Sequence, residues 1–303
     1  MIEAVLATVI TAATPLLLAA MGELVVERSG TLNLGVEGMM IVGAVSAFAV
    51  AQTTGSPYAG LVAAILAGVA LSALFALFAV WLATNQVATG LALTIFGLGV
   101  AGMVGESFVG RPGVKLDRFD IPVLADLPLV GVVFRQDIVF WLSIAVTISV
   151  VVFLFRTRAG LALRAVGDAP AAGHALGLHV LRTRTLAVLF GGACAGAAGA
   201  QLTLVYTTQW IEDVTAGRGW IALALVVFAA WRPLRVVAGA YLFGAVTIAQ
   251  FHAQALGVPV PSQLLAALPY LATIVVLVLI STNRRFTMVN TPAALGRPFV
   301  PDR

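Results

Sequence analysis

Long runs of apolar residues, separated by short polar links, follow one another along almost the whole chain. A membrane-spanning helix needs about 20 consecutive apolar residues, and somewhat fewer where the span is short or broken. The pattern therefore predicts an all-α, polytopic integral membrane protein with about nine spans, in a range of about eight to ten. The predicted spans are 4–20, 39–51, 59–83, 87–107, 137–155, 185–206, 219–230, 236–251 and 264–280.

Composition excludes a water-soluble globular protein. Of 303 residues, 61% are hydrophobic and 10% are charged, and the mean hydropathy is +1.05. Soluble domains are roughly 45–50% apolar and about 25% charged. We therefore interpret residues 1–303 as a single transmembrane domain. The lone cysteine, Cys194, supports neither a disulfide framework nor a metal cluster.

The arginines indicate how the chain is oriented in the membrane. The polar loop 156–184 holds five of them, and cytoplasmic loops carry an excess of Lys and Arg. With this loop in the cytoplasm, the N-terminus lies outside and the C-terminus lies inside. Basic positions at membrane edges also explain the net charge of +4 without nucleic acid as a partner. Twelve of the 17 Lys and Arg residues then fall inside, and five fall outside: Arg111, Lys115, Arg118, Arg135 and Arg218.

The same loop carries the start and stop signals of a short, Ala-rich helix. Asp168 is predicted to be its N-cap, and Pro170 falls in the first turn, where a missing N–H costs nothing. Gly177 is suited to end the helix in the left-handed conformation. Two interpretations stay open: a knob that fits into another protein, or an ordinary loop helix that lies on the membrane surface.

A second polar stretch, 21–38, interrupts the apolar pattern near the N-terminus. Asn33 and Glu37 lie where glycines break the pattern. A broken helix inside a bilayer is tolerated only against protein or a watery cavity, and it offers free N–H and C=O groups to a polar solute. The alternative is a cytoplasmic loop, and span lengths do not decide between the two. Asn85 and Gln86 form a turn between two predicted spans and are further candidates for lining a path.

The chain contains no motif of a known catalytic or nucleotide-binding site. GxxxxGK[ST], HExxH, GxSxG and CxxC are all absent from the sequence. We therefore expect a non-enzyme that binds no cofactor or metal of its own. A different pattern, small residues three and four apart on one predicted helix, permits close packing within the chain or against a second subunit. It comprises Gly191, Gly192, Ala195, Gly196 and Gly199.

Three blocks of the chain resemble the permease subunits of bacterial ABC importers. They read ERSGTLNLGVEGMMIVGA, RAVGDAPAAGHALGLHVLRTRTLAVLFGGACAGAAGAQL and TAGRGWIALALVVFAAWRPL, and they occur in the family order. The resemblance is to the branched-chain amino acid and simple-sugar permease superfamily, over about residues 15–285. It is closest to the nucleoside (ribonucleoside) permeases, since NLGVEG stands where sugar permeases of the group usually carry a motif nearer to GIDLSVG. The pair Asp168-Ala169 departs from the Glu or Asn that this loop often carries.

The resemblance implies a multi-pass subunit in the bacterial inner membrane that imports nucleosides. The same machine with a simple sugar or a branched-chain amino acid as cargo is the alternative, and an ion-coupled secondary transporter is the rival class. The implied partners are two ABC ATPase subunits that hold ATP and Mg, a second related permease as hetero- or homodimer, an extracytoplasmic substrate-binding protein or lipoprotein, and membrane lipid.

The loop helix would then be the coupling helix of the transporter. Flanking Arg164, Arg182 and Arg184 would pair with acids of the ATPase, or would hold the loop at anionic lipid. The substrate-path candidates stay Asn33, Glu37, Asn85 and Gln86. The residues that the resemblance places in contact with the ATPase are Gly167, Asp168, Ala169, Pro170, Ala171, Ala172, Leu176 and Gly177.

Overall fold

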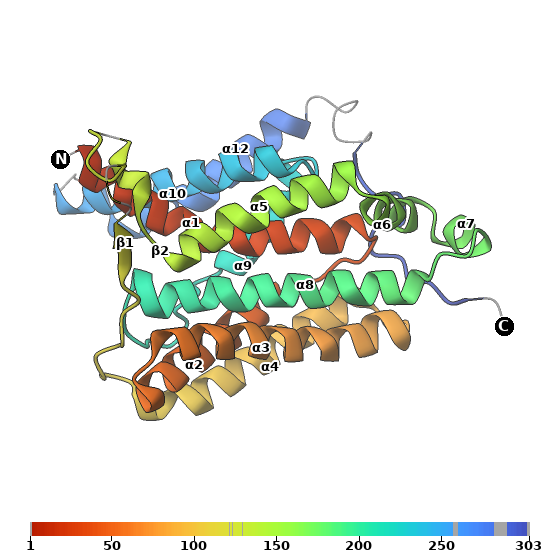
Figure 1. Ribbon diagram of the computed structural model, residues 1–303, viewed down its shortest axis with the longest axis horizontal. Coiled ribbons are helices and arrows are strands. Elements are labelled where there is room, and N and C mark those ends of the chain that lie inside the picture. Colours follow the sequence, from red (N-terminus) through yellow and green to blue (C-terminus); the bar gives the residue numbers. More distant parts are fainter. Residues whose placement is uncertain are drawn as a thin grey trace.

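The computed structural model describes residues 2–120, 122, 124–128, 130–256, 260–281 and 290–301. In this part of the chain, long helices lie side by side along the longest axis of the molecule (Figure 1). The first described residues lie at one end of the bundle, and α7 lies at the other end together with the last described residues. The side of the membrane that each end faces stays a prediction.

The long helices coincide with seven of the predicted spans. Each is long and apolar enough to cross a membrane. The predicted span 219–230 falls on α9, which has only 11 residues. The predicted span 264–280 falls on α11 and α12, and α12 has 14 residues. The count of nine spans therefore stays a prediction. The long helices are α1 (Ile2–Arg28), α2 (Val36–Thr54), α3 (Pro57–Ala76), α4 (Gln86–Gly105), α5 (Ile138–Arg156), α8 (Val180–Gln201) and α10 (Pro233–Ala255).

Shorter elements complete the described chain. A π-helical turn extends α3 over Leu77–Trp81, and another extends α8 over Leu202–Tyr206. The strands β1 (Arg118–Asp120) and β2 (Arg135–Asp137) pair antiparallel. The prediction of an all-α fold did not include this short sheet. The remaining elements are α6 (Arg158–Asp168), α7 (Pro170–Ala175), α9 (Arg218–Phe228), α11 (Ser262–Ala266), α12 (Leu268–Ser281) and the 3₁₀ turns Glu106–Phe108 and Gly131–Phe134.

The first predicted span, 4–20, is too short, because α1 continues to Arg28. Its last two turns carry Glu23 and Glu27, which are 1% and 0% exposed. These acids face protein rather than lipid, so the helix does not have to end at the first polar residue. The polar stretch 21–38 is therefore mostly helical, and only residues 29–35 leave helical geometry.

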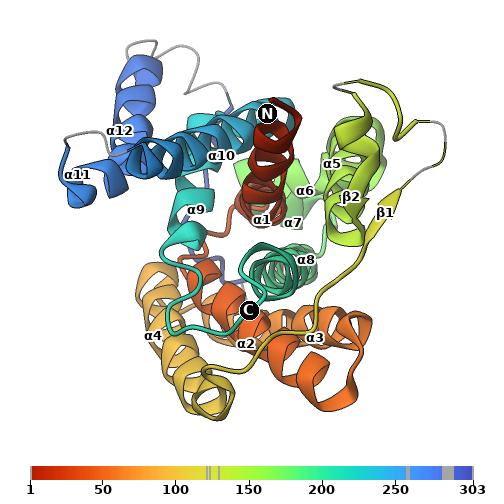
Figure 2. The same cartoon turned by 90° about the vertical axis from the view of Figure 1, so that its left-hand side faces the viewer.

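The helix α8 is the centre of the bundle and packs against α1, α2 and α3, as the view along the bundle shows (Figure 2). A Cβ atom on Gly196 would collide with the carbonyl oxygen of Ala64 in α3, and one on Gly199 with that of Met40 in α2. The predicted small residues therefore serve packing within the chain, where they let backbones approach closely.

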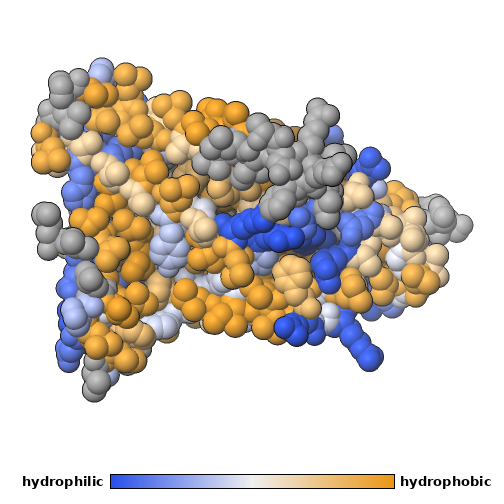
Figure 3. Space-filling view, turned by 90° about the horizontal axis from the view of Figure 1, so that it is seen from above, coloured by the Kyte–Doolittle hydropathy of each residue, from blue (hydrophilic) through white to orange (hydrophobic). Residues whose placement is uncertain are grey.

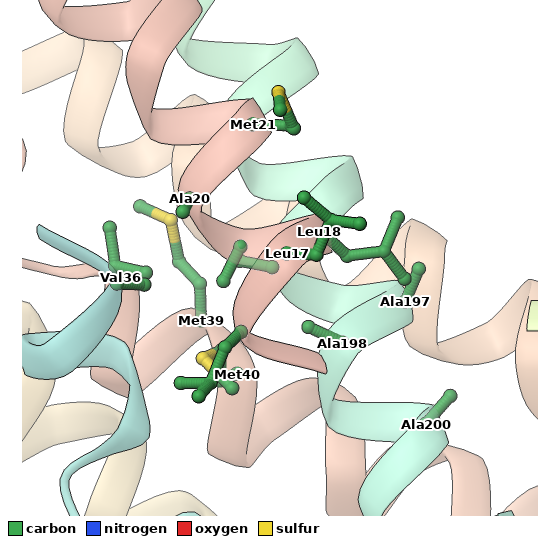
Figure 4. Close-up of a cluster of buried hydrophobic side chains, with 14 of the residues drawn as sticks. Leu17, Leu18, Ala20, Met21, Val36, Met39, Met40, Ala197, Ala198 and Ala200 are labelled. Carbon is green, nitrogen blue, oxygen red and sulfur yellow. The ribbon is translucent and has the colours of Figure 1, made fainter. Parts of the chain in front are cut away.

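The core lies where α1, α2 and α8 meet. Leu17 and Leu18 of α1, Met39 and Met40 of α2 and Ala198 of α8 are buried there (Figure 4). Lipid tails are as apolar as these side chains, so dispersion contacts, rather than escape from water, hold such helices together in a bilayer. Apolar side chains also cover much of the side of the molecule seen in Figure 3, while hydrophilic residues gather along one end and in a patch toward the other.

Candidate coupling loop and buried helix break

The predicted loop helix exists as α7, and it follows a second helix that the sequence reading did not predict, α6. The side chain of Thr157 caps α6, because its Oγ1 accepts a hydrogen bond from Gly160 N at 3.0 Å. Pro170 occupies the first turn of α7 as predicted. Gly177 has a φ of +84°, and the next residue, Leu178, donates its N–H to Gly173 O at 2.9 Å, which ends the helix.

Asp168 does not cap α7, which corrects the prediction. It is the last residue of α6, and Ala169 takes the N-cap position without a side-chain hydrogen bond. The reason is that helical geometry already runs up to Asp168, with Ala169 N donating to Ala165 O at 2.9 Å. The chain therefore bends between two helices instead of entering α7 from an irregular loop, and the bend leaves α7 only six residues long.

One face of α7 is open to the surroundings, while its root is packed. Leu176 is 84% exposed, and Gly173 is buried. Gly167 in α6 is also buried, and a Cβ atom there would collide with the carbonyl oxygen of Arg28. Gly167 therefore anchors the loop to the bundle. The other residues predicted to meet an ATPase are half-buried (Pro170) or exposed: Asp168, Ala169, Ala171, Ala172, Leu176 and Gly177.

The three arginines that flank the loop have different environments. Arg182 is exposed, and Arg164 lies over the ring of Phe155 at 5.4 Å. Arg184 is only 1% exposed, so the prediction that it meets an ATPase acid or anionic lipid is wrong. Its guanidinium is used within the chain, where Nε donates to Ser29 O at 3.2 Å.

The break between α1 and α2 is buried. Ser29, Thr31 and Asn33 are each 0% exposed, and the chain turns back into the bundle before α2 begins (Figure 1). An exposed loop is therefore excluded. Irregular backbone inside a bilayer needs protein around it, and the break has that burial. Its position relative to the membrane stays a prediction.

Side chains of other elements satisfy the backbone of the break. Leu32 N donates to Gln86 Oε1 of α4 at 2.8 Å, and Asn33 N donates to Glu23 Oε1 of α1 at 3.3 Å. The Asn33 side chain closes a local turn, since its Oδ1 accepts from Gly35 N at 3.0 Å. Buried backbone groups need such partners, because an unpaired one costs about as much as a lost hydrogen bond.

Glu37, in the first turn of α2, holds the start of α9. Its Oε1 accepts from Gly217 N at 2.9 Å, and its Oε2 accepts from Gly219 N at 2.6 Å. The first N–H groups of a helix have no partner within the helix and carry partial positive charge, so a carboxylate stabilises them. A Cβ atom on Gly219 would lie only 2.6 Å from the Cα of Glu37, so the two helices meet backbone to backbone.

The end of α9 is held by the last turn of α1. Trp231 Nε1 donates to Glu27 Oε2 at 2.6 Å, and Arg28 Nη2 donates to Trp231 O at 3.0 Å. Glu37 at one end and Glu27 with Arg28 at the other therefore fix α9 between them. We call these three residues the α9 clamp.

Strained backbone lies just outside both ends of α9. Ala216 has a φ of +45°, Ala230 of +48° and Trp231 of +54°. These left-handed conformations are uncommon in residues other than glycine, and each costs about 1–3 kcal/mol of conformational free energy. They persist only where the surrounding structure over-determines them, which the α9 clamp does here. Such strain gathers at functional sites, so the two ends of α9 are candidates for a functional role.

Asn85 and Gln86, the two adjacent candidates for the substrate path, differ in their exposure and in their hydrogen-bond partners. Asn85 is exposed and caps α4, with its Oδ1 accepting from Ala88 N at 3.0 Å. Gln86 is 2% exposed and faces the break. Asn33 and Glu37 also lie at the break, so three of the four candidates come together there and Asn85 does not. Contact of any of them with a solute stays a prediction.

Three residues of this region were not selected from the sequence: Glu23, Glu27 and Trp231. A usable signal existed for the two acids, which lie four residues apart on an apolar helix and therefore share one face.

Three buried polar atoms near the break are unpaired. Within the described part of the chain, Glu23 Oε2, Glu27 Oε1 and Gln86 Nε2 make no hydrogen bond. Each costs free energy unless it bonds to water or to a solute.

The family model for branched-chain amino acid transport system permease components matches residues 5–281. The chain belongs to this family. The match runs from the first turn of α1 to the last residue of α12, so it includes the loop, the break and the α9 clamp. The predicted resemblance to ABC permeases is thereby confirmed.

Curated relatives are similar over nearly their whole length. The chain is 39% identical over 307 residues to the putative glucose ABC transporter permease protein of Haloferax volcanii, covering 94% of this chain and 93% of the relative. It is 28% identical over 312 residues to the guanosine ABC transporter permease protein of Bacillus subtilis, covering 95% and 93%. It is 30% identical over 292 residues to the nucleoside ABC transporter permease protein of Lactococcus lactis, covering 92% of both. No solved structure matches the chain.

Proposed function

We propose that the chain is the transmembrane subunit of an ATP-driven importer, with its N-terminus outside and α7 in the cytoplasm. The observation that carries the coupling assignment is α7 itself. This helix of six residues begins at Pro170 and is followed by its C-cap, Leu176, which is 84% exposed. It stands at the end of the bundle (Figure 1). Membership of an ABC permease family supports the class of machine.

The partners are those that a permease of this class requires. ATPase subunits, which hold ATP and Mg, bind at the α7 end of the bundle, and a second related permease completes the transmembrane pair. A substrate-binding protein or lipoprotein delivers the solute at the opposite end. The relatives are named as ABC transporter permease proteins, which supports this assembly in general terms.

Coupling follows from the stiffness of the loop. A short helix with fixed ends moves as a unit, whereas a flexible loop would absorb the displacement. Closure of the ATPases on ATP displaces α7, and its root at Gly167 lies directly on the Arg28 carbonyl at the start of the break. The displacement thus biases two packings of the helices, one open to each side of the membrane.

The favoured cargo is a nucleoside. Two relatives named for guanosine and for nucleosides are 28% and 30% identical to the chain. A simple sugar is the second candidate, favoured by the 39% identity to the relative named for glucose. Both are neutral solutes rich in hydroxyl groups, and they need hydrogen bonds rather than a charged clamp. A branched-chain amino acid, the remaining alternative, is zwitterionic and would need charged partners.

Uptake into proteoliposomes tests the proposal. The chain is reconstituted with its candidate ATPase, partner permease and binding protein, and labelled adenosine, glucose and leucine are compared with and without ATP. We expect ATP-dependent uptake of adenosine. ATP-dependent uptake of glucose or leucine alone would replace the cargo and keep the machine, whereas uptake driven by an ion gradient without ATP would refute the ABC assignment.

Two substitutions of one exposed residue test the coupling role. Ala172→Arg places a long charged side chain on the open face of α7, and we expect it to abolish ATP-dependent uptake. Ala172→Ser keeps the small size and is the matched control, with uptake expected near that of the unchanged protein. Equal uptake by Ala172→Arg and Ala172→Ser would contradict the assignment of α7 as the coupling helix.

A further inference from the structure

The C-terminal segment 290–301 lies against the end of the bundle that carries α6 and α7 (Figure 1). Two of its N–H groups donate to segments that are far apart in the sequence. Ala294 N donates to Gly167 O of α6 at 3.0 Å, and Gly296 N donates to Gly30 O of the break at 3.1 Å. Ala294 is only 5% exposed. The segment is therefore built into the fold and joins the coupling loop to the break.

Arg184 closes this arrangement from the first turns of α8. Its Nη1 donates to Arg297 O in the C-terminal segment at 2.9 Å, and its Nε donates to Ser29 O in the break at 3.2 Å. A buried guanidinium is costly without hydrogen bonds. Nε and Nη1 have such bonds, whereas Nη2 has no partner within the described residues. One side chain thus ties three segments together: α8, the break and the C-terminal segment.

Side-chain packing continues the connection as far as α7. Leu295 packs against the main core of the bundle. Further along, the ring of Phe299 lies against that of His174 in α7, with centroids 5.6 Å apart. The contacts of residues 292–299 therefore run from the interior of the bundle to the outermost helix of the loop.

We infer that residues 292–299, which we call the C-terminal strap, form with Arg184 the rigid link that transmits movement of α6 and α7 to the break between α1 and α2. The inference rests on the proposed coupling role of α7. The strap and Arg184 are assigned a positioning role, because the contacts that carry the inference join parts of the chain to one another. With the strap removed, Gly167 and Gly30 each lose a hydrogen bond that holds them in register, so displacement of α7 is absorbed locally.

Two variants test the inference by different routes. A chain that ends at Thr291 lacks the strap, and Arg184→Gln keeps the full chain but removes the guanidinium bonds. We expect both complexes to assemble and hydrolyse ATP, while the solute moved per ATP falls by about tenfold, within the range typical of coupling between sites. Arg184→Lys retains one charged donor and is expected to restore part of the ratio.

Matched controls separate the strap from general damage. A chain that ends at Phe299 keeps the strap, and Arg118→Gln removes an exposed arginine in β1 at a distant position. Both are expected to keep the unchanged ratio. A normal ratio in the Thr291-terminated chain or in Arg184→Gln would overturn the inference, as would loss of assembly in both, which would indicate a role in folding alone.

The outcomes also distinguish this inference from the proposed function. If the unchanged complex moves no solute with ATP, the proposed function fails first. A different set of results refutes only the strap inference: the unchanged complex transports solute, Ala172→Arg blocks this transport, and the strap variants keep the normal ratio of solute moved per ATP.

Discussion

Replacing Glu37 tests whether the α9 clamp holds the interior of the bundle. Its two carboxylate oxygens accept hydrogen bonds from Gly217 N and Gly219 N, at 2.9 and 2.6 Å. Glu37→Ala removes both acceptors, one from the half-buried Gly217 N and one from the buried Gly219 N. Glu37→Gln keeps one oxygen and turns an NH₂ group toward the second N–H.

The magnitude follows from these two bonds. A hydrogen bond to a charged group contributes about 1.5–3 kcal/mol, so Glu37→Ala costs ~3–6 kcal/mol, and Glu37→Gln costs about half of that. A large domain loses roughly 2–4 °C of melting temperature per kcal/mol. We therefore expect the melting temperature to fall by ~6 °C or more in Glu37→Ala, and by a smaller amount in Glu37→Gln.

Thermal unfolding of the purified protein in detergent measures the shift, and proteoliposome uptake measures the consequence. Glu106→Gln is the matched control, since Glu106 is an exposed acid at the end of α4. Its melting temperature is expected to stay unchanged. If Glu37→Gln and Glu37→Ala melt within a degree of Glu106→Gln, a difference too small for even one such bond, then Glu37 does not hold α9 and the clamp is refuted.

Three further substitutions test other parts of the structure. Trp231→Phe removes the 2.6 Å bond to Glu27, and should lower the unfolding free energy by ~1–3 kcal/mol in denaturant titrations. Gly196→Ala should lower the melting temperature, because its Cβ would collide with α3, whereas Gly102→Ala, with open space around it, should not. Asn85→Ala removes only a helix cap, so a loss of ~1 kcal/mol with normal uptake is expected; strongly reduced uptake would instead place Asn85 on the path.

The sequence predicted best those elements that depend on residues close together in the chain. Runs of apolar residues located all seven long helices, because a span needs little more than length and composition. Pro170 and Gly177 located α7 for a similar reason, since each has a conformational preference of its own. The N-cap prediction failed because α6 is helical up to Asp168, so that residue is not free to cap α7.

The polar interior could not be predicted, because its bonds join residues far apart in the sequence. Glu27 meets Trp231, and Arg184 meets Ser29, and no periodicity relates members of such pairs. Arg184 shows the consequence most plainly. Its place in a basic loop suggested exposure, yet it is 1% exposed because backbone carbonyls from two other segments surround it.

The break between α1 and α2 is the part of the chain best suited to have two arrangements. Within a helix, each hydrogen bond belongs to a cooperative ladder, so moving one residue disturbs its neighbours. The backbone of the break is held instead by separate bonds, from Gln86, from Glu23 and from Gly296 of the strap. Exchanging these bonds one at a time costs about 1 kcal/mol each. Gly167 packs on one end of the break, and Glu37, at the other end, holds the start of α9. On the proposed coupling role, a small displacement of the loop formed by α6 and α7 would therefore reach the strained ends of α9 without unfolding any helix.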